Sequence, residues 1–121
     1  MTTPEQFFGE NHIALATFRA VRGALEAGFP DVEVRVSKSQ VAFRLGRGFA
    51  YLWTPAQYVR GATAPVVLSI ALTDRLDSPR FKEVVHPGPW IHHLEVRDAA
   101  SIDDEVRGWL NRAATAAADD R

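Results

Sequence analysis

The apolar residues between positions 11 and 28 follow the period of an α-helix. They recur at intervals of three or four residues along one stripe, formed by Ala14, Phe18, Val21 and Leu25. A stripe with this spacing is typical of a helix that packs against a core. Asn11 is a favourable N-cap and Gly28 a favourable C-cap, so the pattern predicts a helix between these two residues.

Two further helices are predicted near the ends of the chain. Thr3 and Gln6 have the spacing of a capping box, which predicts a short helix directly after Thr3. Ser101 and Asp104 repeat that spacing before the final apolar segment. The apolar residues of this segment share one helical face and are Ile102, Val106, Trp109, Leu110 and Ala113. We expect the end of this helix, over residues 116–121, to fray.

Between these helices the apolar period changes to two, the period of a β-strand. The alternation predicts five strands, over residues 32–36, 41–45, 49–53, 66–72 and 90–96. The first three are joined by links so short that they must pair antiparallel. The strand over 66–72 is apolar on both faces, which favours a central place in the sheet. Ser78 and Pro79 predict a short helix that reaches Val85.

The grouping of the predicted elements defines a fold class. Helices come first, a run of mostly antiparallel strands follows, and a helix closes the chain. This order predicts an α+β fold, with an antiparallel sheet of about five strands and the N-terminal and C-terminal helices packed on one face. The opposite face of the sheet is expected to stay partly open. At this length, residues 1–121 are expected to form a single domain.

Composition narrows the classes of protein further. Apolar residues make up 46% and charged residues 24% of the chain, as in ordinary globular domains. The absence of cysteine excludes disulfides and thiolate chemistry, and it fits a reducing compartment. We see no secretory signal and no apolar run near the ~20 residues that a membrane helix needs. The sequence therefore predicts a cytoplasmic protein without a membrane partner.

The net charge is only −1, but the charges are unevenly distributed. Residues 35–82 contain eight basic and two acidic residues, an excess of six positive charges, so the remainder carries seven net negative charges. Such a separation can produce a surface of one sign. The basic and hydroxyl side chains of this segment form our candidate ligand-binding set: Arg35, Ser37, Lys38, Ser39, Arg44, Arg80 and Lys82.

Two interpretations of this basic set remain open. Arg35 and Ser37 share one face of a strand, and Arg80 and Lys82 stand at the start of the predicted short helix. Arginine offers a bidentate fork and a helix N-terminus offers free N–H groups, so the set could hold phosphate or carboxylate. Alternatively, these cations pair with carboxylates of the terminal segments, such as the first turn of the last helix.

The sequence gives little support for metal binding or for hydrolase catalysis. Adjacent strand residues point to opposite faces, so His92 and His93 should not share a metal ion; one should be buried and hydrogen-bonded and the other on the surface. We expect no metal, no cofactor and no catalytic residue. Serines at 39, 69 and 78 could be placed beside either histidine, but the sequence has no Gly-x-Ser-x-Gly elbow.

The aromatic residues of the third predicted strand allow two functions. Phe49, Tyr51 and Trp53 alternate within the basic segment, where exposed rings could stack on nucleic-acid bases. Alternating aromatic residues are more often part of a core, because they bury large apolar areas. We therefore expect no nucleic-acid partner.

Four stretches of the sequence resemble a known family. They cover Val34–Arg44, Leu76–Val85, His92–Val96 and Asp103–Leu110. These stretches are similar to the domain-of-unknown-function family 5655, and the likeness spans nearly the whole chain. A fainter resemblance is to YdhG-like domains, which also place a strand hairpin after an N-terminal helix. The resemblance implies a stand-alone bacterial domain without an established activity, so it offers no catalytic residue to carry over.

The sequence thus predicts a non-catalytic module that binds an anionic small molecule or an acidic partner through its basic central segment. One alternative is a small enzyme of unrecognised type that works in the same groove. Another is a self-associating interaction domain, such as a homodimer, which the apolar residues on both faces of several strands suggest.

Overall fold

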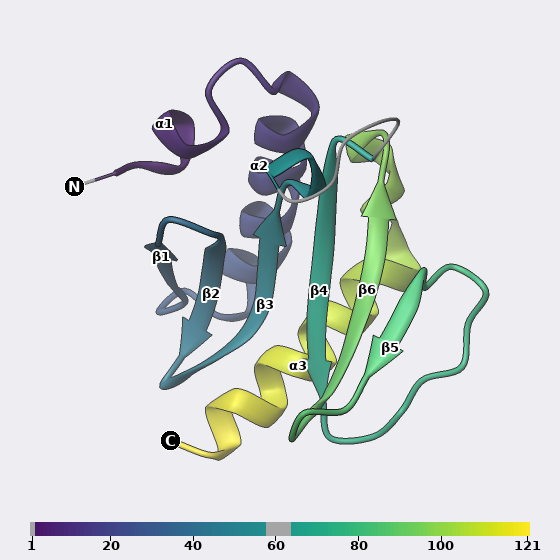
Figure 1. Cartoon of the computed structure of the whole chain (residues 1–121). Helices are drawn as coiled ribbons and strands as arrows, with labels where there is room; N and C mark the ends of the chain where they lie inside the picture. The colour runs from purple at the N-terminus through teal and green to yellow at the C-terminus, as the bar shows by residue number, and fades with distance from the viewer. Residues whose placement is uncertain (1, 58–63) are drawn as a thin grey trace.

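The fold is built on one antiparallel sheet (Figure 1). The computed structural model describes residues 2–57 and 64–121. Within these residues the six strands follow the spatial order β1-β2-β3-β4-β6-β5, and each neighbouring pair is antiparallel. The strands are β1 (Glu33–Val36), β2 (Val41–Leu45), β3 (Arg47–Trp53), β4 (Val66–Leu72), β5 (Glu83–Val85) and β6 (Trp90–Val96).

The two long helices lie together on one face of this sheet, behind the strands as Figure 1 is drawn, and the short first helix lies beside the second. The α-helices are α1 (Pro4–Phe8), α2 (His12–Gly28) and α3 (Asp104–Asp119), and two single 3-10 turns are η1 (Pro55–Gln57) and η2 (Ala99–Ser101). The predicted α+β class is confirmed, with six strands in place of about five. In the described part of the chain, no helix is both long and apolar enough to cross a membrane.

Local sequence signals explain the first two helices. At α1 the Thr3 hydroxyl accepts a hydrogen bond from the Gln6 amide, and the Gln6 side chain accepts one from the Thr3 amide, which completes the predicted capping box. At α2 the Asn11 side chain accepts from the backbone amide of Ala14. The predicted apolar stripe of α2 is buried, and its Phe18 ring stacks on Phe43 of β2 at 5.7 Å.

The last helix differs from its prediction at both ends. Its N-cap is Asp103, whose carboxylate accepts from the Val106 amide, so Ser101 belongs to η2 instead. The helix α3 continues to Asp119, within the segment 116–121 that was expected to fray. Two long-range ion pairs of the final residues, Arg47–Asp120 at 2.9 Å and Arg121–Asp31 at 2.7 Å, hold this end in place.

The predicted short helix that reaches Val85 is also wrong, because residues 83–85 form the edge strand β5. The Lys82 amide donates to the His93 carbonyl, and Glu83 is the cross-strand partner of His93. Only one turn remains of the local helix signal, where the Phe81 amide donates to the Ser78 carbonyl. Pairing with β6 satisfies the backbone of this segment and therefore outweighs its local preference.

A β-bulge changes the expected arrangement of aromatic residues on β3. The register between β2 and β3 shifts at Phe43 and Arg44, so Phe49 has no opposite partner. Phe49 and Ala50 both point into the core and are fully buried. Phe49 therefore does not share a face with Tyr51, although the alternation of apolar residues suggested that it would.

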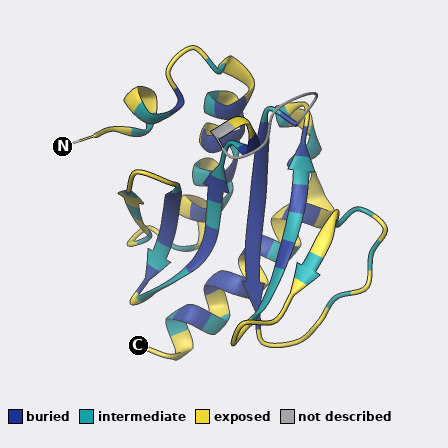
Figure 2. Cartoon of the chain, viewed as in Figure 1, coloured by how far each residue is buried: buried dark blue, intermediate teal, exposed yellow. Residues whose placement is uncertain are grey.

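The central strand β4 is buried on both faces, as predicted (Figure 2). Its Val66, Leu68, Ile70 and Leu72 belong to the hydrophobic core beneath the helices. Its remaining side chains face away from the helices and are Val67, Ser69 and Ala71. Among the described residues no helix covers this second face, which agrees with the expectation of a partly open sheet. The neighbouring strands β3 and β6 bear larger side chains there, and these bury the small ones of β4.

Candidate functional site

The uncovered face of the sheet contains two adjoining hollows over β3, β4 and β6. The larger has a volume of about 360 Å³ and is lined by Ser39, Gln40, Tyr51, Trp53, Ser69, Ile91 and His93. The smaller, of about 150 Å³, is lined by Trp53, Pro55, Val67, Lys82, Glu83, His93 and Glu95. They share Trp53 and His93, and we call them together the open-face groove. The groove forms because β4 bears small side chains on this face, whereas the neighbouring strands β3 and β6 bear larger ones.

A chain of hydrogen bonds crosses the floor of the groove. The Trp53 indole Nε1–H donates to the Ser69 hydroxyl over 2.8 Å, and the Ser69 Oγ lies 2.7 Å from the His93 Nδ1. The two rings also meet edge to face, with centroids 5.9 Å apart. Ser69 is only 3% exposed, so its hydroxyl acts as a buried link that fixes both rings.

Burial and hydrogen bonding together govern the charge and the tautomer of the His93 ring. Burial lowers the pKa of His93 below its usual value of 6.5; nearby Glu83 opposes this shift, and neighbouring His92 adds to it. The ring is therefore neutral at neutral pH. The Ser69 hydroxyl accepts from Trp53, and either Ser69 Oγ or His93 Nδ1 can be the donor in the hydrogen bond between them. When Ser69 donates, the neutral imidazole carries its proton on Nε2, where it is a hydrogen-bond donor.

The Ser69–His93 pair has the spacing of a nucleophile and its base, but the surroundings favour a positioning role. A serine that attacks a substrate must reach it, whereas Ser69 is almost entirely buried beneath its neighbours. Its oxygen also accepts the Trp53 indole hydrogen, which reduces its availability for attack. The geometry is better suited to holding a donor ring in place than to covalent chemistry.

His92 occupies the opposite face, as the sequence predicted for one of the two histidines. It is fully buried, its Nε2 accepts from the Leu76 amide, and its Nδ1 lies 3.2 Å from the Ile70 carbonyl. Within residues 2–57 and 64–121, no group of three or more acidic or imidazole side chains is arranged to hold a metal ion.

The candidate basic set is divided among several places. Ser39 and Lys82 line the open-face groove, each in a different hollow. Ser37 holds the β1–β2 turn, since its Oγ accepts from the backbone amides of Ser39 and Gln40, and exposed Lys38 lies in the same turn.

The arginines of this set lie further from the groove. Arg35 and Arg44 stand on the uncovered face of β1 and β2, where Arg44 donates to the Gly46 carbonyl. Arg80 lies on the helix side and pairs with Asp103 at 3.0 Å and Glu105 at 2.9 Å. These hydrogen bonds raise the pKa of Arg80. Its pairing matches our alternative interpretation, in which the first turn of the last helix neutralises it.

Several groove residues were missed by sequence reasoning. Gln40, Ile91, Glu83 and Glu95 line the groove, yet none was among the candidate binding residues. Their position follows from the register that pairs Tyr51 with Ser69 and Ser69 with His93. Arg60, which contributed to the basic excess, lies outside the described residues.

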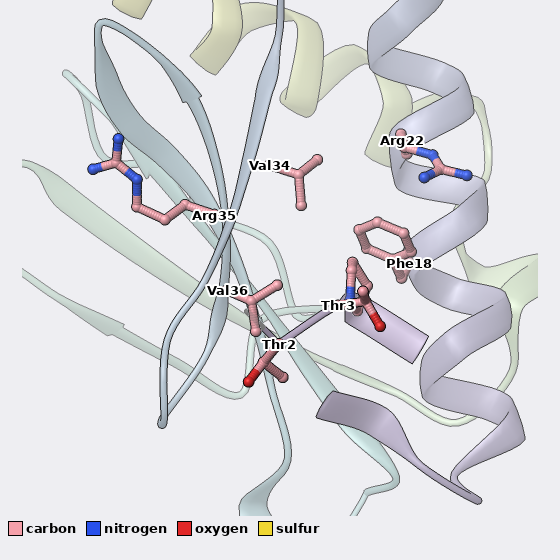
Figure 3. A pocket seen from close by; sticks show the side chains of 8 residues that line it. Thr2, Thr3, Phe18, Arg22, Val34, Arg35 and Val36 are labelled. Atoms are coloured by element: carbon pink, nitrogen blue, oxygen red, sulfur yellow. The ribbon is translucent and has the colours of Figure 1, made fainter. Parts of the chain in front are cut away.

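A second region of interest lies between helix α2 and the edge strand β1 (Figure 3). This hollow of about 420 Å³ is lined by Thr2, Thr3, Pro4, Phe18, Arg22, Val34, Arg35 and Val36, and we call it the β1–α2 groove. The side chains of Val34 and Val36 point toward Phe18, whereas Arg35 points to the other side of its strand.

The fold and these sites define a small α+β domain, with helices on one face of an antiparallel sheet and a groove on the other. The chain belongs to a family of this kind: residues 5–114 match the domain of unknown function DUF5655, which confirms the resemblance seen in the sequence. No curated protein and no solved structure shows significant similarity to the chain. The fainter likeness to YdhG-like domains stays a prediction.

Proposed function

We propose that this domain is a non-catalytic module that binds a small anionic molecule in the larger hollow of the open-face groove. The observation that carries the proposal is the set of hydrogen-bond donors around one hollow. Ser39, Gln40 and His93 line it with hydroxyl, amide and imidazole groups, and no carboxylate of the described residues lines it. Its volume of about 360 Å³ lies within the range of small-molecule sites.

The charges that line the two hollows indicate where the negative group of the ligand would bind. Two carboxylates, Glu83 and Glu95, line the smaller hollow against one cation, Lys82, so its net charge would repel an anion. The anionic group is therefore assigned to the larger hollow, which Ser39, Gln40 and His93 line. Ile91 and the rings of Tyr51 and Trp53 offer apolar contact to the rest of the ligand. Arg35 and Lys38, on the same side of the sheet, would add a favourable field.

Binding of an anion should be coupled to uptake of a proton by His93. In the free protein this ring is neutral, because burial lowers its pKa. A bound anion favours the charged imidazolium and raises that pKa. The affinity for the anion should therefore increase as the pH falls from neutral toward 6. An enzyme would instead consume its substrate, so chemical stability of the bound molecule separates the two functions.

A thermal-shift screen with carboxylates, phosphorylated metabolites and nucleotides tests the proposal. A ligand at ~100 times its dissociation constant adds about 2.7 kcal/mol of stability, roughly 10 °C in Tm for a domain of this size. Substitution His93→Gln should weaken binding of a ligand so found and abolish its dependence on pH. The matched control is His86→Gln, an exposed histidine outside the groove. The proposal fails if no anion stabilises the protein, or if both variants bind equally well.

A further inference from the structure

The strand β1 ends the sheet on one side. In the described residues it pairs only with β2, through the partners Glu33–Arg44, Val34–Phe43, Arg35–Ala42 and Val36–Val41. An edge strand keeps one row of backbone N–H and C=O groups available for another chain. The opposite edge, β5, offers only three residues.

The register shows which backbone groups of β1 face outward. The Ser37 amide donates to the Gln40 carbonyl, so this pair is hydrogen-bonded across the hairpin. Because hydrogen-bonded and non-hydrogen-bonded pairs alternate in an antiparallel ladder, Arg35 and Glu33 also bond to β2. The N–H and C=O groups of Val34 and Val36 therefore point away from the sheet.

The same two valines contribute to an apolar hollow beside that edge. Val34 and Val36 are half-buried and face Phe18 of α2 in the β1–α2 groove (Figure 3). The groove thus combines free backbone groups with an apolar floor, which is the arrangement that peptide-binding domains use to add a strand. A strand added here would place alternate side chains into the groove.

Charge indicates which peptide would fit. The remaining side chains of an added strand would lie on the other face, next to exposed Arg35. Arg22 stands at the rim of the groove and already pairs with Glu26 at 3.3 Å, whereas exposed Lys38 lies in the turn after β1. In the symmetric register that pairs Val34 with Val36, a second copy of this chain added through its own β1 would bring the two Arg35 side chains opposite each other, which disfavours that register.

We propose that β1 binds an extended acidic peptide as a seventh strand, with its apolar side chains in the β1–α2 groove and a carboxylate beside Arg35. This interaction is independent of the ligand site on the open face, because the two grooves share no lining residue. The partner is a protein segment that alternates apolar and acidic residues in extended form.

Amide hydrogen exchange of the full chain tests the proposal. The probe is a capped hexapeptide in which valine alternates with glutamate, and its control has lysine in place of glutamate. The glutamate peptide should slow exchange of the Val34 and Val36 amides at least tenfold, and the lysine peptide should not. Protection of the β5 amides instead, equal effects of both peptides, or no protection at millimolar peptide would overturn it. A dimer that protects these amides without peptide would also overturn it.

Two variants separate the backbone contribution from the charge contribution. Val34→Pro removes an outward N–H and leaves the hydrogen bonds between β1 and β2, so it should abolish peptide binding while the spectrum of the sheet persists. Arg35→Glu should weaken binding about tenfold, since it replaces attraction with repulsion. The control Arg97→Glu makes the same charge change at an exposed position after β6. Equal affinity of these two charge variants would refute the role of Arg35.

Discussion

The hydrogen-bond chain on the open face can be tested by removing its central hydroxyl. Ser69→Ala eliminates the acceptor of the Trp53 indole and the hydrogen-bond partner of the His93 Nδ1. Each such hydrogen bond contributes about 0.5–1.5 kcal/mol net, so the loss of both should cost about 1–3 kcal/mol. In a domain of this size the melting temperature should fall by roughly 4–12 °C. The larger values apply if no water replaces the lost hydroxyl in its buried position.

Urea unfolding followed by tryptophan fluorescence gives the free energy of unfolding, and NMR titration gives the pKa of His93. In Ser69→Ala this pKa should rise, because a donor to Nδ1 favours the neutral ring and the substitution removes it. Ser39→Ala, at an exposed hydroxyl of the same groove, is the matched control and should change stability by less than about 0.5 kcal/mol. The reasoning is refuted if Ser69→Ala has wild-type stability and leaves the pKa of His93 unchanged.

Three further predictions concern the groove and the helix-side ion pairs. The free energy of unfolding of the wild type, measured with urea, should fall as the pH drops through about 6.5. The reason is that His93 in the unfolded chain takes up a proton there, whereas folded His93 has a lowered pKa and does not. His93→Gln should flatten this part of the curve of stability against pH. Gly48→Ala should displace the Tyr51 ring, since a Cβ there would lie 2.5 Å from its hydroxyl oxygen; a wild-type chemical shift for Tyr51 would contradict this. Arg80→Ala should raise the pKa of Asp103 in an NMR titration. The pKa should nevertheless stay below 3.8, because the hydrogen bond from the Val106 amide lowers it more than Arg80 does.

The sequence predicted those parts of the fold whose signals are local. The stripe of α2 and the alternation in β2, β4 and β6 each repeat over several residues, so periodicity suffices to find them. The strand β5 has only three residues, and its pairing with β6 depends on backbone contacts that no local pattern encodes. The bulge that buries Phe49 was missed for the same reason, since it depends on the register between β2 and β3.

The candidate site was less predictable than the fold. Ser69 and His93 are 24 residues apart and meet only because β4 and β6 pair in one register. Neighbourhood in the sequence was also a poor guide to neighbourhood in space: Arg80 and Lys82 are two residues apart, yet Arg80 pairs with α3 whereas Lys82 lines the open-face groove. The excess of positive charge along the chain was correct as a count, but it did not indicate which cations already have partners.

The central claim is that the larger hollow of the open face holds an anion beside His93. The most direct measurement is an NMR titration of the labelled protein with the anion that stabilises it most, which follows the Trp53 indole, the backbone amides of Ser39 and Gln40, and the His93 ring. The account predicts that these signals shift together with one dissociation constant and that the pKa of His93 rises on binding. Shifts confined to other surfaces, or an unchanged pKa of His93 at saturation, would contradict it.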